Sequence, residues 1–328
     1  MNPRSLSRWQ QLRQYYEGFW GTWLLHVGRE LGLFRALLQQ PGRSSQQLAE
    51  HLGYESEYVE VWCRAAHSYD YLEGDSQGWN VAEGWESLLD ALGAWASTYA
   101  QLSNRVYESL EAVFRGRALP ESSLNLRLHL SEGMRASYHW LWHELFSEHE
   151  VLRERLQRSK RLIEYGCGFG LGLEGLRQAQ PHLELTGMEW DYDCAREAER
   201  ATRAVVVVGL PEMSTYRNRF DMALFHRALS LCQDPRGALA RAVEGLRKGG
   251  LLVVVSESEL PGVDNGGSPS RMRIRMGERF FYQMFHSTDA LRSIALDQIE
   301  KWLGVLGMKR VYREDEPVGG SPIVVMAR

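Results

Sequence analysis

Cysteine is scarce in this chain and long hydrophobic runs are absent, and each absence excludes a class of protein. The 328 residues include four cysteines, none in a C-x-x-C pair, which argues against structural zinc and favours reduced thiols in a cytoplasm. No apolar run reaches the ~18 residues of a membrane-spanning helix, and residues 1–14 are too polar for a secretory leader. We therefore expect a cytoplasmic protein with no membrane partner and no metal.

An excess of charge of either sign is also missing. The formal net charge is −4, hydrophobic residues make up 44% of the chain and charged residues 24%, which is ordinary for a soluble globular protein. Such a balance gives no general attraction to nucleic acid. The length is enough for two domains of ordinary size.

Glycine, in contrast, is concentrated in the stretch that organises the rest of the chain. Residues 161–172, RLIEYGCGFGLG, combine a short apolar strand ended by Glu164 with glycines at alternate positions, and a helical pattern follows. Strand, glycine turn and helix open a nucleotide-binding α/β unit, in which glycines let the backbone turn sharply and approach a ligand. The glycines of this loop are Gly166, Gly168 and Gly170.

The spacing of these glycines argues against a dinucleotide ligand. The G-x-G-x-x-G fingerprint needs its third glycine one residue later, where this chain has Leu171. The carboxylate of Glu164 would repel a pyrophosphate but suits a cationic or amine-bearing ligand. An NADP-dependent oxidoreductase is therefore disfavoured.

Alternating strands and helices continue beyond the loop. The expected strands lie at 182–189, 204–208, 219–225, 251–255, 309–314 and 323–327, and the expected helices at 194–203, 235–247 and 290–304. Glu189 ends the second strand roughly 20 residues past the glycines, where nucleotide-binding folds hold a ribose diol. Trp190 follows directly and is a candidate to stack on adenine.

The pattern E-x-G-x-G-x-G from Glu164 to Gly170 resembles motif I of the class I S-adenosylmethionine-dependent methyltransferases. The string LRKGGLLVVV at 246–255 resembles the L-x-P-G-G turn of that family. The resemblance implies a Rossmann-like α/β fold whose seven strands follow the order 3-2-1-4-5-7-6, with the last strand antiparallel. It also implies S-adenosylmethionine as cofactor and S-adenosylhomocysteine as product.

The same resemblance assigns further residues to the cofactor. In the family, an acid that follows a glycine after strand three often bonds the adenine amino group. This chain has Leu210 after Gly209, so that bond must come from the backbone or be absent, and Leu210 is a candidate to line the adenine slot. The segment after strand four faces the cofactor methyl group in class I enzymes, which brings in Phe225 and His226.

The N-terminal half is expected to be mostly helical, with a wing. The helical patterns lie at 15–39, 44–53 and 56–69, and the two short strands of the wing lie within 71–81. A winged helix can bind DNA through its second helix, but Glu55, Glu57 and Glu60 on that helix suit phosphates poorly. The string LAEHLGY followed by a wing instead resembles the N-terminal dimerisation domain of bacterial and plant small-molecule O-methyltransferases.

This second resemblance predicts a homodimer and three parts of the chain. They are a winged-helix-like dimerisation domain at 1–85, a helical linker and substrate cap at 86–157, and an S-adenosylmethionine-binding domain at 158–328.

The cap has helical patterns at 85–114 and 124–157. The second includes His139, Trp142 and His143, an aromatic cluster that either packs between domains or forms a wall of the acceptor pocket.

Two residues beyond strand five are further candidates to contact the acceptor. Glu257 follows that strand directly and is placed to orient a base or the acceptor, with an ordinary loop acid as the alternative. Tyr282 follows an arginine-rich segment, 271–279, whose arginines either bind an acidic acceptor or are simply solvated.

The catalytic base is where the sequence departs from the family. Methyl transfer is an in-line displacement from an activated sulfonium, so the protein positions the reactants and, where needed, removes a proton. The family uses a histidine in an L-H-D-W context after strand four, and alignment places Ser230 there. An unassisted serine is a poor base.

Three explanations of this departure remain open. His226 takes the role, or His286 or a cap histidine reaches in, or the acceptor needs no base and catalysis is by proximity.

The sequence therefore predicts a methyltransferase for a small, aromatic or polycyclic acceptor, with O-methylation favoured over C- or N-methylation. A catalytically silent winged-helix protein that binds the cofactor and regulates a partner is the alternative from another class.

Overall fold

The computed structural model describes residues 3–86, 131–256, 294–315 and 321–328, with isolated positions at 88–89, 96–97, 100, 114–115, 128 and 277. The chain divides into two compact units, Met1–Glu108 and Ser109–Arg328. The division into three parts, with boundaries after residues 85 and 157, stays a prediction. Within the described residues, no helix combines the length and the apolar composition that crossing a membrane requires.

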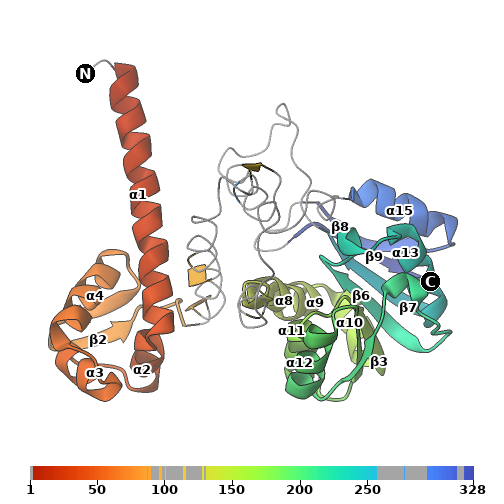
Figure 1. Cartoon of the computed structure of the whole chain (residues 1–328), viewed down its shortest axis with the longest axis horizontal. Coiled ribbons are helices and arrows are strands. Elements are labelled where there is room, and N and C mark those ends of the chain that lie inside the picture. The colour runs from red at the N-terminus through yellow and green to blue at the C-terminus, as the bar shows by residue number, and fades with distance from the viewer. Residues whose placement is uncertain are drawn as a thin grey trace. The chain divides into compact units, whose positions relative to one another are not determined.

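Residues 3–81 of the first unit form four helices and a two-stranded wing (Figure 1). Its elements are α1 Pro3–Glu30, α2 Leu33–Gln39, α3 Ser45–Leu52, α4 Ser56–Ser68, β1 Leu72–Asp75 and β2 Gly78–Val81. β1 and β2 pair antiparallel, so the predicted wing is confirmed. α3 begins with a capping box between Ser44 and Gln47 and ends at Gly53, as its sequence predicts.

The first helix differs from the prediction at both ends. The pattern predicts one helix over 15–39, whereas α1 already begins at Pro3, ends at Glu30, and is followed by the separate helix α2. Gly32 causes the break, because it adopts a left-handed conformation with φ 70° that ends a helix. The early start is hidden in the sequence by the polar character of the first residues, which are exposed along α1.

The core of the first unit includes the C-terminal end of α1. Phe34 on α2 and Trp62 on α4 pack edge to face, with 5.0 Å between their ring centroids. Both rings lie against Gly28 of α1, where an added Cβ would be 2.4 Å from each. Gly28 therefore allows α1 to approach the other two helices closely.

The segment before the main sheet is not the single helix predicted over 124–157. Its described part contains α8 Arg135–His139, the π-helical stretch η1 Trp140–Leu145, α9 Phe146–Glu148 and α10 Glu150–Arg158. The helix also breaks at His149, which is extended with φ −85° and ψ 106°. A π-helical turn shifts the apolar face around the helix axis, which a regular helical period cannot reveal. The helix predicted over 85–114 lies almost wholly outside the described residues.

A seven-stranded sheet forms the centre of the second unit. Its strands are β3 Arg161–Tyr165, β4 Glu184–Glu189, β5 Val205–Val208, β6 Phe220–His226, β7 Leu246–Val255, β8 Lys309–Glu314 and β9 Ile323–Ala327. They lie in the order β5-β4-β3-β6-β7-β9-β8, and β9 is antiparallel to both of its neighbours. Numbered within the sheet, this order is 3-2-1-4-5-7-6, so the predicted topology is confirmed. β7 begins at Leu246, earlier than predicted, because Leu246 pairs with Phe220 before an irregularity in the register.

Helices cover both faces of the sheet (Figure 1). The remaining elements are α11 Leu171–Ala179, α12 Tyr192–Thr202, the short turns η2 Pro211–Met213 and η3 Leu229–Leu231, α13 Pro235–Gly245 and α15 Leu296–Val305. Side chains alternate between the two faces along each strand, so on β3 Leu162 packs with α8 and α11 and Ile163 packs with α13 and α15. β3 to β7 are parallel, and their carboxyl ends therefore meet at one edge.

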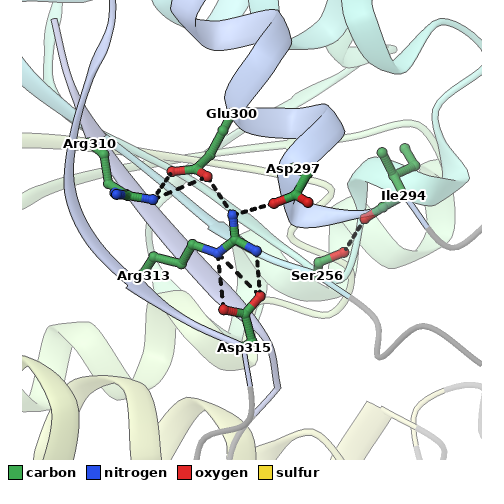
Figure 2. Close-up of polar contacts among 7 residues, drawn as sticks. All are labelled: Ser256, Ile294, Asp297, Glu300, Arg310, Arg313 and Asp315. Carbon is green, nitrogen blue, oxygen red and sulfur yellow. Dashed lines mark hydrogen bonds and ion pairs between the residues drawn. The ribbon is translucent and has the colours of Figure 1, made fainter. Parts of the chain in front are cut away.

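An ion-pair network fastens α15 to β8 (Figure 2). Arg313 on β8 contacts Asp297 and Glu300 on α15, both at 2.5 Å, and its Nη2 donates to Asp315 at 2.6 Å. Arg310 adds a contact of 3.2 Å to Glu300. Several of these side chains are well exposed to water, which weakens each pair, so we expect the network to orient α15 more than to stabilise the fold.

Two glycines of α1 provide a matched test of the packing in the first unit. Gly28→Ala inserts a methyl group against Phe34 and Trp62, and we expect the free energy of unfolding to fall by about 1–3 kcal/mol. Gly18→Ala meets no atom within 4 Å and improves a helix position, so we expect a gain of up to about 1 kcal/mol. Urea denaturation followed by tryptophan fluorescence measures both variants, and equal effects would contradict the packing described.

Candidate active site

The glycine loop between β3 and α11 turns through three left-handed residues. Gly166, Gly168 and Gly170 have φ values of 70°, 53° and 81°, a region that side chains disfavour. An added Cβ on Gly166 would lie 2.4 Å from the Cβ of Ala228, and one on Gly170 would lie 2.8 Å from Thr202 Cγ2. One on Gly168 would have no described atom within 4 Å. Gly166 and Gly170 thus let the loop pack closely against its neighbours, while Gly168 faces space that a ligand can fill.

Glu189 is held beside this space by two backbone donors. Its side chain is 4% exposed. The Gly168 N–H donates to Oε2 at 2.8 Å, and the Asp191 N–H donates to Oε1 at 2.9 Å. Burial raises its pKa, although these backbone bonds oppose the rise. Each carboxylate oxygen retains a lone pair, so Glu189 can accept the two hydroxyls of a ribose diol, and this role stays a prediction.

Glu164 is the second buried carboxyl group of the site. It is 0% exposed, and the Tyr138 hydroxyl donates to its Oε1 at 2.6 Å. Its Oε2 is buried and has no hydrogen-bond partner among the described residues. Burial raises the pKa of Glu164 to about 8, and the bond from Tyr138 lowers it. An orphaned buried oxygen is costly, and an ammonium group would satisfy it.

His226, the last residue of β6, lies on the same face of the sheet. Its ring stacks on Tyr138 at 3.9 Å, and its Nε2 is 2.9 Å from the Ser137 hydroxyl. Burial, with a smaller effect from Arg227, lowers its pKa to about 3. A base this weak removes protons poorly near neutral pH. This low pKa is poorly matched to the role of general base, and the assignment of His226, as base or beside the cofactor, stays a prediction.

The remaining cofactor candidates differ in what they offer a ligand. Phe225 is fully buried on the opposite face of the sheet, stacked on Tyr165 at 5.0 Å, so its side chain faces away from His226.

Trp190 is half-buried, and its six-membered ring lies against Gly166. The Gly209 N–H donates to the Glu189 carbonyl at 2.9 Å, which brings the end of β5 beside Glu189; the adjoining Leu210 is half-buried.

Ser230 lies in η3, the short turn after β6. Its hydroxyl is buried and has no hydrogen-bond partner among the described residues. Without a neighbouring base it remains a weak nucleophile and a weak base.

The aromatic cluster of the cap divides between the surface and the core. His139 and His143 stack on one another at 4.7 Å and are exposed; burial and then His139 lower the pKa of His143. Trp142 is 3% exposed and packs on Phe146 at 5.1 Å. For Trp142, the contacts are those of core packing.

Three predicted residues, Glu257, Tyr282 and His286, lie outside the described residues, and their roles stay predictions. Among the described residues, no group of metal-binding side chains gathers closely enough to hold an ion.

Sequence reasoning missed Ser137 and Tyr138 as site residues. Tyr138 directly precedes the aromatic cluster of His139, Trp142 and His143, but no local pattern connects it with Glu164, 26 positions later. The available signal was alternation along the strands, because Glu164 on β3 shares a face with Leu162, and α8 packs there.

A family model described as a methyltransferase domain matches residues 138–302. The match begins at Tyr138 and includes the glycine loop, Glu189 and the end of β6. Among curated proteins, an uncharacterised protein of Methanocaldococcus jannaschii is 24% identical over 110 residues, or 33% of this chain. The aligned part spans about half of that relative, 54% of its length.

Several solved structures share the fold across the chain. The pyocyanin biosynthetic protein PhzM is 17% identical with a TM-score of 0.71, over 98% of this chain and 99% of that one. Human N-acetylserotonin methyltransferase, solved with S-adenosylmethionine, is 16% identical with a TM-score of 0.68, over 100% and 99% of the two chains. The mitomycin 7-O-methyltransferase MmcR is 18% identical with a TM-score of 0.60, over 99% and 98%.

The burial of His226 gives a prediction for its titration. With a pKa of about 3, against roughly 6.5 for an unperturbed histidine, its ring stays neutral when the protein is brought from pH 7 to about pH 5. Nitrogen-15 NMR of histidine-labelled protein measures this, and the signals absent from His226→Gln identify the residue. Protonation of that ring with a midpoint near pH 6 in the folded protein would contradict the burial described.

Proposed function

The chain belongs to the methyltransferase-domain family, and on that premise we propose that it transfers a methyl group from S-adenosylmethionine to a small aromatic or polycyclic acceptor. The observation that carries this proposal is the Glu189 carboxylate, fixed by the Gly168 and Asp191 N–H groups beside the space over the glycine loop. A carboxylate at the end of the second strand holds a ribose in folds of this topology.

The site residues divide among the parts of the cofactor. Glu189 would bind the ribose, Glu164 the ammonium group, and Trp190 with Gly209 and Leu210 the adenine. The loop glycines leave room for the ligand backbone, and the backbone of Phe225 with the ring of His226 borders the methionine end. The bound cofactor supplies a methyl group on a positively charged sulfur.

The chain's own contribution to the reaction is positioning and charge. Two buried carboxyl groups, Glu164 and Glu189, favour a cationic ligand, and Tyr138 of α8 donates a hydrogen bond to Glu164. Orienting donor and acceptor in line supplies most of the catalysis that an activated methyl group needs. All four cysteines are buried, which fits reduced thiols in a cytoplasmic enzyme.

Oxygen is the favoured acceptor atom, and the resemblance to mitomycin 7-O-methyltransferase supports it. One observation favours the alternative of N- or C-methylation without a general base. Ser230 stands where the family histidine is expected, and the pKa of His226 is lowered to about 3 by burial. An acceptor that is already ionised or intrinsically nucleophilic needs no proton removal.

A second copy of the chain is the partner that we propose for α1. Trp9, Leu12, Tyr16, Phe19 and Trp23 repeat at alternating three- and four-residue steps and are between 41% and 59% exposed. This spacing is the a/d pattern of helices that pair along a seam. Large exposed apolar patches mark interaction surfaces, and α1 extends well beyond α2, α3 and α4 in Figure 1.

Binding of S-adenosylhomocysteine tests the cofactor site. We expect isothermal titration calorimetry to give a micromolar or tighter dissociation constant. Gly168→Val fills the space over the loop, and Glu189→Ala removes the ribose acceptor, so each should weaken binding at least tenfold, or ~1.4 kcal/mol. No detectable binding by the wild-type protein would refute the proposed function.

Gly249→Val is the matched control for these variants. Gly249 also has a positive φ, 80°, but it lies near the amino end of β7, away from the strand ends that form the site. It should lose stability without losing affinity for S-adenosylhomocysteine. An equal loss of affinity in all three variants would trace the effect to folding.

Sedimentation velocity tests the proposed seam on α1. Phe19→Asp places a charge within the apolar stripe and should convert a dimer into a monomer at micromolar concentration. Gln14→Asp adds the same charge to an exposed position of α1 outside the stripe and should leave the dimer intact. A wild-type monomer, or a dimer that survives Phe19→Asp, would contradict the seam.

A further inference from the structure

Tyr138 is fixed on both sides within the candidate site. Its hydroxyl donates to Glu164 Oε1 at 2.6 Å, and its ring stacks on His226 at 3.9 Å. Behind it, His226 contacts Ser137 on the same helix. The side chain is 8% exposed. Helix α8 therefore places the Tyr138 phenol, held on both sides, at the end of β3. This phenol holds the Glu164 carboxyl group in one orientation.

The phenol can act here only as a donor. Burial and the neighbouring Glu164 raise the pKa of Tyr138 well above its usual value, so the hydroxyl keeps its proton. Oε1 of Glu164 is therefore permanently engaged, whereas Oε2 is buried and has no partner among the described residues. A Cβ added to Gly172 would lie 2.7 Å from Oε2, so glycine there leaves the oxygen free of side-chain contact. One proton or one small cationic group can satisfy it.

The described groups that face Glu164 do not supply that cation. Glu189 on β4 and Cys167 in the glycine loop act on it electrostatically, and neither carries positive charge. His226 on β6 is neutral because burial lowers its pKa. On α8, the guanidinium of Arg135 is engaged by Glu132 and Glu174.

We propose that Glu164 exchanges its proton for the ammonium group of the cofactor, and that Tyr138 is the positioning residue that sets the pH of this exchange. The neutral carboxyl group loses its proton to solvent as the ammonium group arrives, so one proton is released for each ligand bound and charge is conserved. This inference rests on the proposed cofactor site and adds a proton-linked step to it.

The direction of the pH effect follows from the geometry. Because burial raises the pKa of Glu164 to about 8, a proton competes with the ammonium group below that pH, and affinity rises roughly tenfold per pH unit up to it. The Tyr138 hydrogen bond lowers the pKa of Glu164. Removing the hydroxyl should therefore move the rise in affinity to higher pH.

The experiment compares Tyr138→Phe with the wild-type full-length chain. Calorimetry with S-adenosylhomocysteine between about pH 6 and pH 8.5, in buffers of different ionisation enthalpy, gives the affinity and the number of protons released. We expect nearly one proton released at pH 7 in the wild type and a shift of the affinity profile to higher pH in Tyr138→Phe. 5′-Methylthioadenosine, which lacks the ammonium group, should bind with neither effect.

Tyr312→Phe is the matched control. The Tyr312 hydroxyl also donates to a carboxylate, Glu314 Oε2, at 2.5 Å, but on β8 at the antiparallel edge of the sheet. It should keep the wild-type pH profile. If Tyr138→Phe fails to fold, Glu164→Gln carries the test, since an amide cannot ionise and should abolish both the pH dependence and the proton release.

Three results would overturn the inference or part of it. If both ligands bind the wild type but S-adenosylhomocysteine releases no proton, the exchange is wrong while the proposed function stands. If Tyr138→Phe folds, binds and keeps the wild-type profile, Tyr138 does not set the pH of the exchange. If neither ligand binds the wild type, the proposed function and the inference fall together.

Discussion

The hydrogen bond from the Gly168 N–H to the Glu189 carboxylate is the contact on which the rest of the site depends. It joins the loop after β3 to the end of β4, and it requires Gly168 to take a left-handed conformation. Gly166 and Gly170 make that possible, because their lack of a side chain lets the loop pack against Ala228 and Thr202. The result is an acid fixed beside an open backbone, which suits a nucleoside ribose.

This edge of the sheet could be predicted from sequence because short local patterns of residues indicate each of its parts. Glycine spacing reports backbone conformation, apolar runs report strands, and parallel strands bring their ends together. The contact between Tyr138 and Glu164 is of another kind, since it depends on how α8 packs on the sheet, and no short pattern encodes that. The π-helical turn at 140–145 disturbs the regular period by which the position of α8 would be inferred.

Neighbouring residues on one strand show a second limit of motif reasoning. The resemblance brings in Phe225 and His226 together, but successive side chains of a strand point to opposite faces. His226 therefore meets Tyr138, while Phe225 stacks on Tyr165 in the other core. The helix break at Gly32 was missed for a related reason, because an apolar repeat can continue across a left-handed residue that ends the helix.

The charges of the site bear on how the proposed reaction would distinguish the methyl donor from the product. Glu164 and Glu189 are both buried, and burial raises the pKa of each, so a cationic ligand beside them would favour their ionised forms. Methyl transfer removes the positive charge from the sulfur. In the proposed reaction the product would therefore lose part of its attraction to these carboxyl groups, while its ammonium group would stay beside Glu164. The proposed site would discriminate donor from product by charge near the sulfur and would rely on positioning, more than on a strong base, for the transfer itself.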